Sequence, residues 1–576
     1  MSTISRLHRW LPFLTWPRPD RQLLRGELWA GMTVGLMLVP QGVAYAALAG
    51  MPLVSGIYAS LLPAIVAVLW SSSTRLGVGP TALTSLLIGT SLTGLAVPGS
   101  AQWVALAVWM ALLSGALQLL LGVVRFGWLL QLVTSPVLGG FTQAAAWLIL
   151  ASQLPTLTGL GVPLETLLAA PQWSHFDWGG AGFGLGSVAA LVLAKRQWPQ
   201  FPAVTVVIGG AGALSWALGY AEGGGKVIGA LPAGLPHFYW PGALPWETFG
   251  ALIMPVLVIT LVSFLETASS AKVDHQSGGT RWNENQDLIA HGMAKISSGL
   301  CGGFTTSASF SRSAINLYAG ARTGWATIFA TALVLVALLW LLPALYYVPQ
   351  AVLAAVVVTA VTGLIKPGMF RQLWRISRIE ASISAATFAI TLATAPRLYW
   401  GVLAGLLVNL SHFLYQRLHP RIIEVGLHPD GSLRDRHLWH LAPLAPDVLA
   451  LRMDAELDFA SASALERNLS DRLAHLPHVR HVCLFAQSIN RIDVTGVETF
   501  ARIEALVRFH GSTLHVSGLK LPVEQVLLRA QVLRPDQHLR LYRSDAAAIA
   551  ALQGASTEKD GEMGALPQTQ SRLGDK

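Results

Sequence analysis

Long apolar runs with few charged side chains recur along the first 415 residues. The first series lies at about 28–50, 52–70, 77–89, 102–124, 128–153, 181–195 and 203–219, and the second at about 246–271, 287–300, 309–320, 325–342, 346–364, 380–395 and 398–415. A helix needs ~20 apolar residues to cross the hydrocarbon of a bilayer. The pattern therefore predicts a polytopic α-helical membrane protein of fourteen elements, arranged as a seven-plus-seven inverted repeat.

Two stretches depart from this apolar pattern, and each is the third element of its series. Gly77–Gly89 opens with Gly79-Pro80, and Cys301–Gly324 reads CGGFTTSASFSRSAINLYAGARTG. Unpaired backbone and a guanidinium are costly in hydrocarbon, so neither stretch is typical of a lipid-facing helix. Interrupted segments in corresponding halves of a repeat indicate a binding site near the bilayer midplane.

Helices that begin inside the membrane present free backbone N–H groups and the positive end of a dipole, which favour a bound anion. The residues expected at the two helix starts are Pro80, Thr81, Ala82, Ser309, Phe310, Ser311 and Arg312. Arg312 would add a fixed positive charge, or would instead form a salt bridge with Glu266 or extend to the membrane surface. The alternative for the small residues is that they only permit close helix packing.

Glu266 is the carboxylate that lies within an otherwise apolar span near these residues. A carboxyl group in an apolar span is protonated more readily than one in water, so Glu266 could carry a proton together with the anion. The alternative is a permanent charge partner for Arg312 or Lys272.

The charge distribution agrees with a membrane protein. Hydrophobic residues make up 53% of the 576 residues and charged residues 12%, with a formal net charge of +9. Lys and Arg cluster in the short loops that share a side with the N-terminus, which predicts cytoplasmic termini rather than nucleic-acid binding. Cys301 and Cys483 suggest no disulfide, and the chain has no Walker motif and no Cys/His cluster. We therefore expect neither an enzyme nor a cofactor or metal site.

The composition changes after His419. Residues 416–446 are rich in His, Pro and Arg and are interpreted as a linker, whereas residues 447–553 alternate strand-like and helical segments, which predicts a soluble α/β domain. Residues 1–27 are expected to be a cytoplasmic N-terminus, 28–415 the transport domain, and 554–576 a disordered tail.

Three motifs in this order resemble the SulP (sulfate permease) family. VPQGVAYAALAGMPLVSGIYASLLPAIVAVLWSSSTRLGVGP (Val39–Pro80) is similar to the first signature of that family and WNENQDLIAHGMAKISSGLCGGFTTSASFSRSAINLYAGARTG (Trp282–Gly324) to its second. INRIDVTGVETF (Ile489–Phe500) is similar to its STAS domain. The resemblance implies core and gate subdomains, a cytoplasmic STAS domain and a homodimer.

The resemblance also implies roles for individual residues. It places Gln41 and Tyr45, which share one helix face, beside the anion site. It places Thr495 where STAS antagonists carry a phosphorylatable Ser or Thr, although Val494 departs from the Ser that usually precedes it. Thr495 is thus either a regulatory phosphorylation site or the cap of a helix, and the STAS domain could also dock a cytoplasmic protein.

The functional hypothesis is secondary active transport of a sulfate-like inorganic anion, or bicarbonate or a dicarboxylate, across the inner membrane by proton symport. The alternatives are an anion exchanger, a sodium-coupled bicarbonate transporter, or a membrane-tethered STAS regulatory protein.

Overall fold

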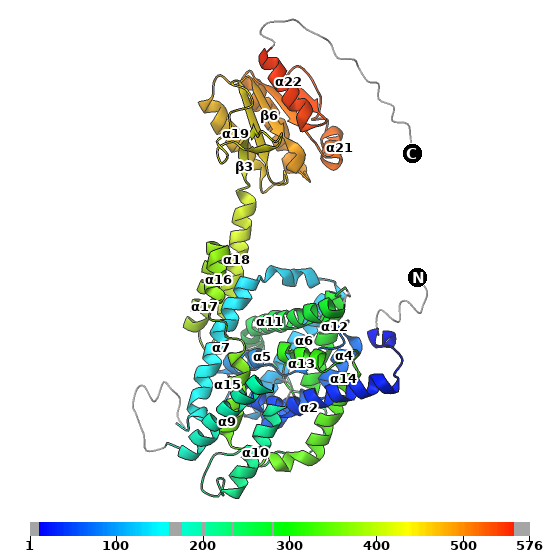
Figure 1. The fold of residues 1–576 in the computed structure, drawn as a ribbon, viewed down its shortest axis with the longest axis vertical. Coiled ribbons are helices and arrows are strands. Elements are labelled where there is room, and N and C mark those ends of the chain that lie inside the picture. Colours follow the sequence, from blue (N-terminus) through cyan, green and yellow to red (C-terminus); the bar gives the residue numbers. More distant parts are fainter. Residues whose placement is uncertain (1–10, 161–175, 199–201, 233, 279–280, 558–576) are drawn as a thin grey trace. The chain divides into compact units, whose positions relative to one another are not determined.

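The computed structural model describes residues 11–160, 176–198, 202–232, 234–278 and 281–557 (Figure 1). The chain divides into two compact units, Met1–Asn409 and Leu410–Lys576. The N-terminal Arg6 and Arg9 and the part of the expected tail from residue 558 onward lie outside the described residues.

The first unit is helical, and its helices follow the apolar runs of the sequence. In chain order they are α2 (Arg21–Leu48), α3 (Leu53–Tyr58), α4 (Leu62–Trp70), α5 (Ala82–Leu92), α6 (Ala101–Val123), α7 (Ser135–Leu157), α9 (Trp178–Gln197), α10 (Ala203–Ala217), α11 (Trp246–Gly278), α12 (Glu284–Leu300), α13 (Phe310–Tyr318), α14 (Trp325–Val336), α15 (Gln350–Thr362), α16 (Met369–Ile376), α17 (Arg378–Ala393) and α18 (Tyr399–Leu418). Each predicted membrane element overlaps at least one of them. Seven helical segments of the described chain are long and apolar enough to cross a membrane by themselves.

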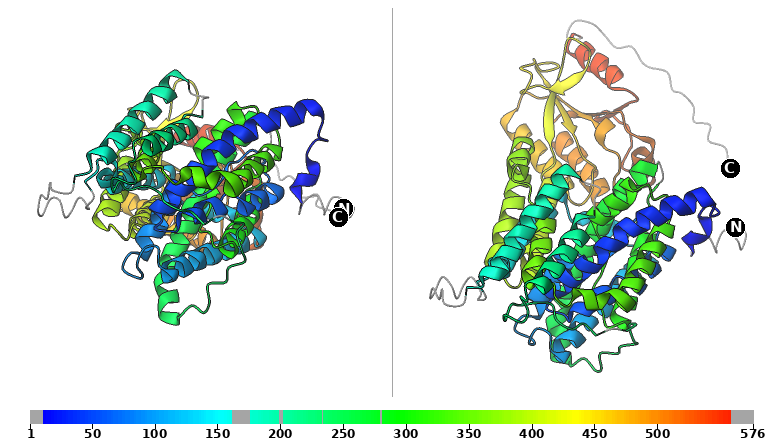
Figure 2. Two further views of the ribbon diagram at one scale, coloured as in Figure 1. Left: turned by 90° about the horizontal axis from the view of Figure 1, so that it is seen from below. Right: turned by 60° about the horizontal axis from the view of Figure 1, so that its bottom comes forward.

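Small residues allow the central helices to approach closely. Helix α2 packs against α3 where Gly42 meets Gly56, and a Cβ atom added to Gly56 would lie 1.9 Å from the Gly42 carbonyl oxygen. Helix α12 meets α6 in the same way, with Gly292 against Gly115. Figure 2 shows α2 (blue) running alongside α14. Helix association by small residues is common in membranes, where interfaces depend on close packing.

Two very short strands connect the halves of this unit. β1 (Val78–Gly79) precedes α5, and β2 (Ser307–Ala308) precedes α13. The two strands pair antiparallel, with Val78 opposite Ala308 and Gly79 opposite Ser307. The sequence predicted the two interrupted helices that follow these strands but not the pairing that joins them.

The second unit contains a six-stranded sheet in the order β4-β3-β5-β6-β7-β8. Its elements are β3 (Ile422–Leu427), β4 (Leu433–Asp435), β5 (Val448–Met453), α19 (Ala462–His475), β6 (His481–Phe485), α20 (Val494–Phe509), β7 (Thr513–Ser517), α21 (Leu521–Arg529), β8 (Leu539–Tyr542) and α22 (Asp545–Thr557). Strands β5 to β8 run parallel. Alternate side chains of the strands pack against α19, α20 and α21 on one face and against α22 on the other.

Residues 416–446, which were expected to be a linker, contain the first two strands of this sheet. β3 pairs antiparallel with β5 and with β4. Ile423 and Val425 are buried against the sheet core. The many His, Pro and Arg residues of the surrounding segment obscured this short apolar alternation.

Candidate anion site

The β1–β2 pair holds the starts of α5 and α13 next to each other. The Ser309 N–H donates to the Gly77 carbonyl at 2.9 Å, which extends the pairing by one residue toward α13. A Cβ atom at Gly77 would lie 2.6 Å from the Cβ atom of Arg312, so only glycine fits there without rearrangement. The local sequence therefore positions the first turn of α13 directly against β1.

The first turns of both helices leave backbone donors unused. In the described part of the chain, the N–H groups of Ala82, Leu83, Phe310, Ser311 and Arg312 donate to no protein acceptor. The Ser309 side chain does not cap α13, and its hydroxyl lies 3.2 Å from that of Ser311. Unused N–H groups at the positive end of a helix dipole are suited to an anion.

Arg312 is enclosed between three elements, and its exposed fraction is 1%. Its Nη1 donates to the Gln41 Oε1 on α2 at 3.1 Å, and its Nη2 donates to the Pro80 carbonyl at 2.9 Å. Its Nε is buried without a hydrogen-bond partner in the described structure. Arg312 therefore neither reaches the membrane surface nor forms a salt bridge with Glu266, since no carboxylate of the described chain lies within 4.0 Å of it.

Glu266 lies on α11 beside the start of α5. The Thr81 hydroxyl donates to its Oε2 at 2.9 Å, and Thr81 is also the N-cap residue of α5. Among the described residues no cation lies within 4.0 Å of the Glu266 carboxylate, so the expected alternative of a salt bridge to Arg312 or Lys272 is absent from this structure. Thr81 thus connects a candidate proton site with a candidate anion site.

The remaining predicted residues divide into two groups. Gln41, Tyr45, Pro80 and Ala82 are buried around Arg312, and the Tyr45 phenol lies within electrostatic range of both Arg312 and Glu266. Phe310 and Ser311 instead face outward, and 56% of Phe310 is exposed. The structure therefore brings most of the predicted set together and leaves these two side chains at its edge.

A second buried cation, Lys295 on α12, was not predicted from the sequence. Its exposed fraction is 0%, and its Nζ donates to the Gln118 Oε1 at 2.6 Å and to the Ser263 hydroxyl at 2.5 Å. A signal was present, because Asp287, His291 and Lys295 are spaced four residues apart and share one helix face. The prediction of an apolar run over residues 287–300 took no account of these three polar side chains.

In the loop that precedes α20, the helix cap is Asp493 and not Thr495. The Asp493 carboxylate caps α20 by accepting from the Gly496 N–H at 2.8 Å, and it also accepts from the Phe459 N–H. Thr495 is the second residue of the helix and is half-buried. Aspartate takes the cap because it precedes the helix and its carboxylate reaches back over the first turn. Phosphorylation of Thr495 stays a prediction.

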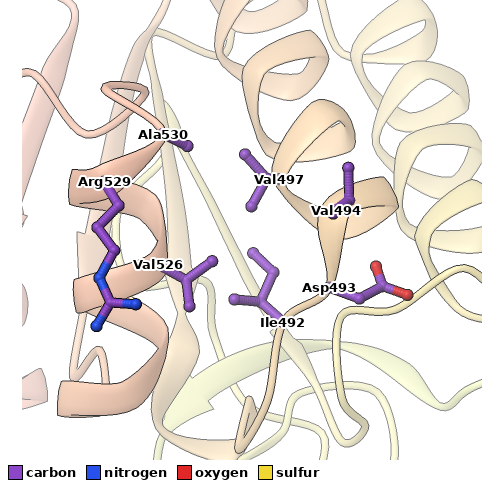
Figure 3. Close-up of a pocket in the computed structure, with 7 residues that line it drawn as sticks. All are labelled: Ile492, Asp493, Val494, Val497, Val526, Arg529 and Ala530. Atoms are coloured by element: carbon purple, nitrogen blue, oxygen red, sulfur yellow. The ribbon is translucent and has the colours of Figure 1, made fainter.

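A shallow apolar depression lies beside this loop (Figure 3). Its wall is formed by residues at the start of α20 and along α21, namely Ile492, Asp493, Val494, Val497, Val526, Arg529 and Ala530. In the described part of the chain no group of three His, Cys, Asp or Glu side chains is placed to hold a metal ion.

Comparison with known proteins places the chain in a family. Residues 24–387, more than half of the chain, match the model of the sulfate permease family, and residues 441–547 match the STAS domain. The chain belongs to the sulfate permease family.

Two relatives illustrate the match to this family. The sulfate transporter 4.1, chloroplastic, of Arabidopsis thaliana is 28% identical over 557 residues, covering 92% of this chain and 80% of the relative. The sodium-independent sulfate anion transporter of Bos taurus is 30% identical over 569 residues, with coverage of 91% and 89%.

A solved structure of the murine Solute Carrier 26 family member A9 anion transporter, in the inward-facing state, has the same fold. The TM-score is 0.85 with 19% identity, and the alignment covers 96% of this chain and 95% of that one. The membrane unit and the C-terminal STAS unit of this sulfate permease family member therefore have the architecture predicted from its sequence.

Proposed function

We propose that the chain is a secondary active transporter that moves a sulfate-like inorganic anion together with a proton. The observation that carries the proposal is the arrangement at the β1–β2 pair. Among the described residues, five backbone N–H groups from two helix starts are unused and lie beside a buried arginine that has no carboxylate partner. Such a site replaces part of the hydration shell of an oxyanion without a permanent counter-ion in competition.

Glu266 is the proposed proton carrier. An ionised carboxylate close to the anion site repels a second negative charge, so protonation of Glu266 favours anion loading. Thr81 links the two events, because it donates to Glu266 and also caps the helix whose N–H groups face the anion. The name of the bovine relative describes a sodium-independent transporter, which favours a proton over sodium here.

Sulfate is the proposed substrate because both relatives described above are named as sulfate transporters. Alternating access would move the α5 and α13 starts as one body, since the β1–β2 pair joins them. We further propose location in the inner membrane with cytoplasmic termini, a homodimer, residues 28–415 as the transport domain and the STAS unit as a site for cytoplasmic partners.

Uptake by the purified full-length chain in liposomes tests the proposal. Radiolabelled sulfate, bicarbonate and succinate are supplied separately, with an inward proton gradient, an inward sodium gradient or no gradient. We expect saturable sulfate accumulation only when the outside is acidic relative to the lumen. Uptake that needs an internal counter-anion would indicate an exchanger, and sodium-driven bicarbonate uptake would indicate the sodium-coupled alternative. Complete absence of uptake would favour a regulatory role for the STAS unit.

A further inference from the structure

Lys295 is a buried ammonium group whose hydrogen-bond partners are both neutral. Gln118 comes from α6 and Ser263 from α11, and each accepts from the Lys295 Nζ. Within the described chain no carboxylate lies within 4.0 Å of this Nζ. Removing an ammonium group from water is unfavourable unless a negative charge compensates it, so Lys295 stabilises an anion bound nearby.

Glu266 on α11 lies within electrostatic range of Lys295, but no carboxylate of the described helices around Lys295 forms an ion pair with it. Helices α4 and α6, which pack against α12, contain no charged side chain. On α12 itself, Asp287 lies eight residues earlier, ~12 Å along the helix axis. The Asp287 carboxylate is already occupied by the hydroxyl groups of Ser71, Ser72 and Ser73, the Ser72 N–H and the Trp282 indole. His291 lies between them, and neither of its ring nitrogens has a hydrogen-bond partner in the described structure.

Lys295 is connected to the anion site through one residue of α11. Ser263 accepts from Lys295 with its hydroxyl, and its carbonyl accepts from the Ser307 hydroxyl of β2 at 2.8 Å. Ser307 is the residue that pairs with Gly79. Glu266 lies one helical turn beyond Ser263 and within electrostatic range of Lys295. Ser263 therefore joins the ammonium to the β1–β2 pair that holds the α5 and α13 starts together.

We propose that Lys295 is a specificity-determining residue that makes the site prefer divalent over monovalent anions, an inference that rests on the proposed function. Arg312 and Lys295 supply two positive charges, and ionised Glu266 supplies one negative charge, so the empty site carries +1. Protonation of Glu266 raises this to +2, and one sulfate dianion then brings the loaded site to zero. A monovalent anion would leave +1 in a low-dielectric interior.

The test compares sulfate with chloride as the divalent and monovalent probes. Lys295→Gln and Lys295→Met are reconstituted in full-length form, and saturating and competitive uptake give the sulfate-to-chloride preference. We expect the preference for sulfate to fall roughly tenfold or more in both variants, because each loses one unit of charge that acts twice as strongly on a dianion. Gln118→Glu, which neutralises the lysine in place, should shift the preference in the same direction.

The controls separate this inference from the proposed function. Lys272→Gln removes an exposed positive charge from α11 and should leave the preference unchanged. If the wild-type chain takes up no anion, the proposed function fails. If the wild-type chain transports sulfate but the Lys295 variants keep its sulfate-to-chloride preference, the specificity role alone fails. An equal loss of sulfate and chloride uptake in variants that remain monodisperse would likewise overturn it, since this would indicate only a structural role.

Discussion

Two glutamates, one in each unit of the chain, differ in the groups that surround their carboxylates. Glu424 on β3 is buried and lies between three basic side chains: it accepts from Arg436, from Arg472 at 3.0 Å and from His437 at 3.2 Å. Glu266 in the membrane unit accepts a hydrogen bond from the Thr81 hydroxyl and has no cation within 4.0 Å among the described residues.

The difference separates a structural charge from a charge that can change. A carboxylate that two arginines share belongs to an ion network, and removal of any member leaves the others uncompensated. A carboxylate that is hydrogen-bonded to hydroxyl groups can gain and lose a proton without dismantling an ion network. In the STAS unit the glutamate joins β3 to α19 and to the segment after β4, whereas in the membrane unit the glutamate is the proposed proton carrier.

The most severe test of this contrast is Glu266→Gln, which fixes the side chain in a neutral state. We expect proton-driven sulfate accumulation to disappear, because no group is left to load the proton, while exchange of internal for external sulfate continues. Uptake into liposomes with and without a pH gradient measures both. Glu247→Gln, at an exposed position on the same helix, serves as the control. Full accumulation by Glu266→Gln would remove Glu266 from the coupling step.

Arg312→Gln should produce the next largest effect. Loss of the buried guanidinium removes a full charge beside the helix starts, so we expect the KM for sulfate to rise by roughly 10- to 100-fold. Concentration-dependent uptake by reconstituted protein gives this value, with Arg322→Gln as an exposed arginine control. An unchanged KM would mean that Arg312 only fastens α13 to Gln41 and Pro80.

Glu424→Gln should affect stability and leave transport intact. We expect the STAS unit to lose about 2 kcal/mol of unfolding free energy, because two partly solvated arginines lose their shared partner. Cys483 is fully buried, so pulse labelling of its thiol at increasing urea concentrations reports the opening of this sheet. Glu498→Gln, at an exposed position on α20, should show wild-type protection. If Cys483 is equally protected in both variants, the cluster around Glu424 contributes no stability.

A smaller, pH-dependent effect is expected at His515 on β7. Burial, together with the neighbouring positive groups, lowers the pKa of His515 to about 4, and its ring is hydrogen-bonded to His481 and Tyr542 at 3.0 Å each. The unfolded chain takes up this proton near pH ~6.5 and the folded chain only near 4, so stability is complete above pH ~6.5 and declines toward pH 4.

Hydrogen exchange of the β6 and β7 peptides in the full-length chain measures this loss. Protection factors, corrected for the intrinsic pH dependence of exchange, should fall between pH 7 and pH 5 in the wild type and less steeply in His515→Gln. His478→Gln, at an exposed position, should follow the wild type. Identical profiles in all three proteins would show that the histidine ring does not report on sheet stability.

The sequence predicted most of the architecture because the bilayer imposes a simple length and polarity requirement on helices. The same reasoning located the two interrupted helices through Gly79-Pro80 and the Ser309–Arg312 segment. It could not predict the pairing of β1 with β2, since two-residue strands carry no periodicity. It also could not predict that Arg312 donates to the Pro80 carbonyl, because every residue has a backbone carbonyl and the sequence does not distinguish one from another.

Three other features were not predicted although the sequence contains a local signal for each. The spacing of His291 and Lys295 indicates a polar face on α12. The mean hydropathy over the whole predicted span does not reveal this face. The alternation of Ile423 and Val425 predicts a strand, yet the surrounding His, Pro and Arg residues hid it. Asp493 has a residue type that is preferred at helix caps, but the sequence motif led to Thr495 as the predicted cap.

The proposed anion site consists mainly of main-chain donors, and this has a consequence for how such proteins diversify. A point mutation replaces a side chain but cannot delete a peptide N–H, except by introducing proline. The capacity to hold a negative ion is therefore inherited with the backbone path itself. Substitutions of a few neighbouring side chains would then change the preferred charge of the transported anion and the ion gradient that drives its uptake.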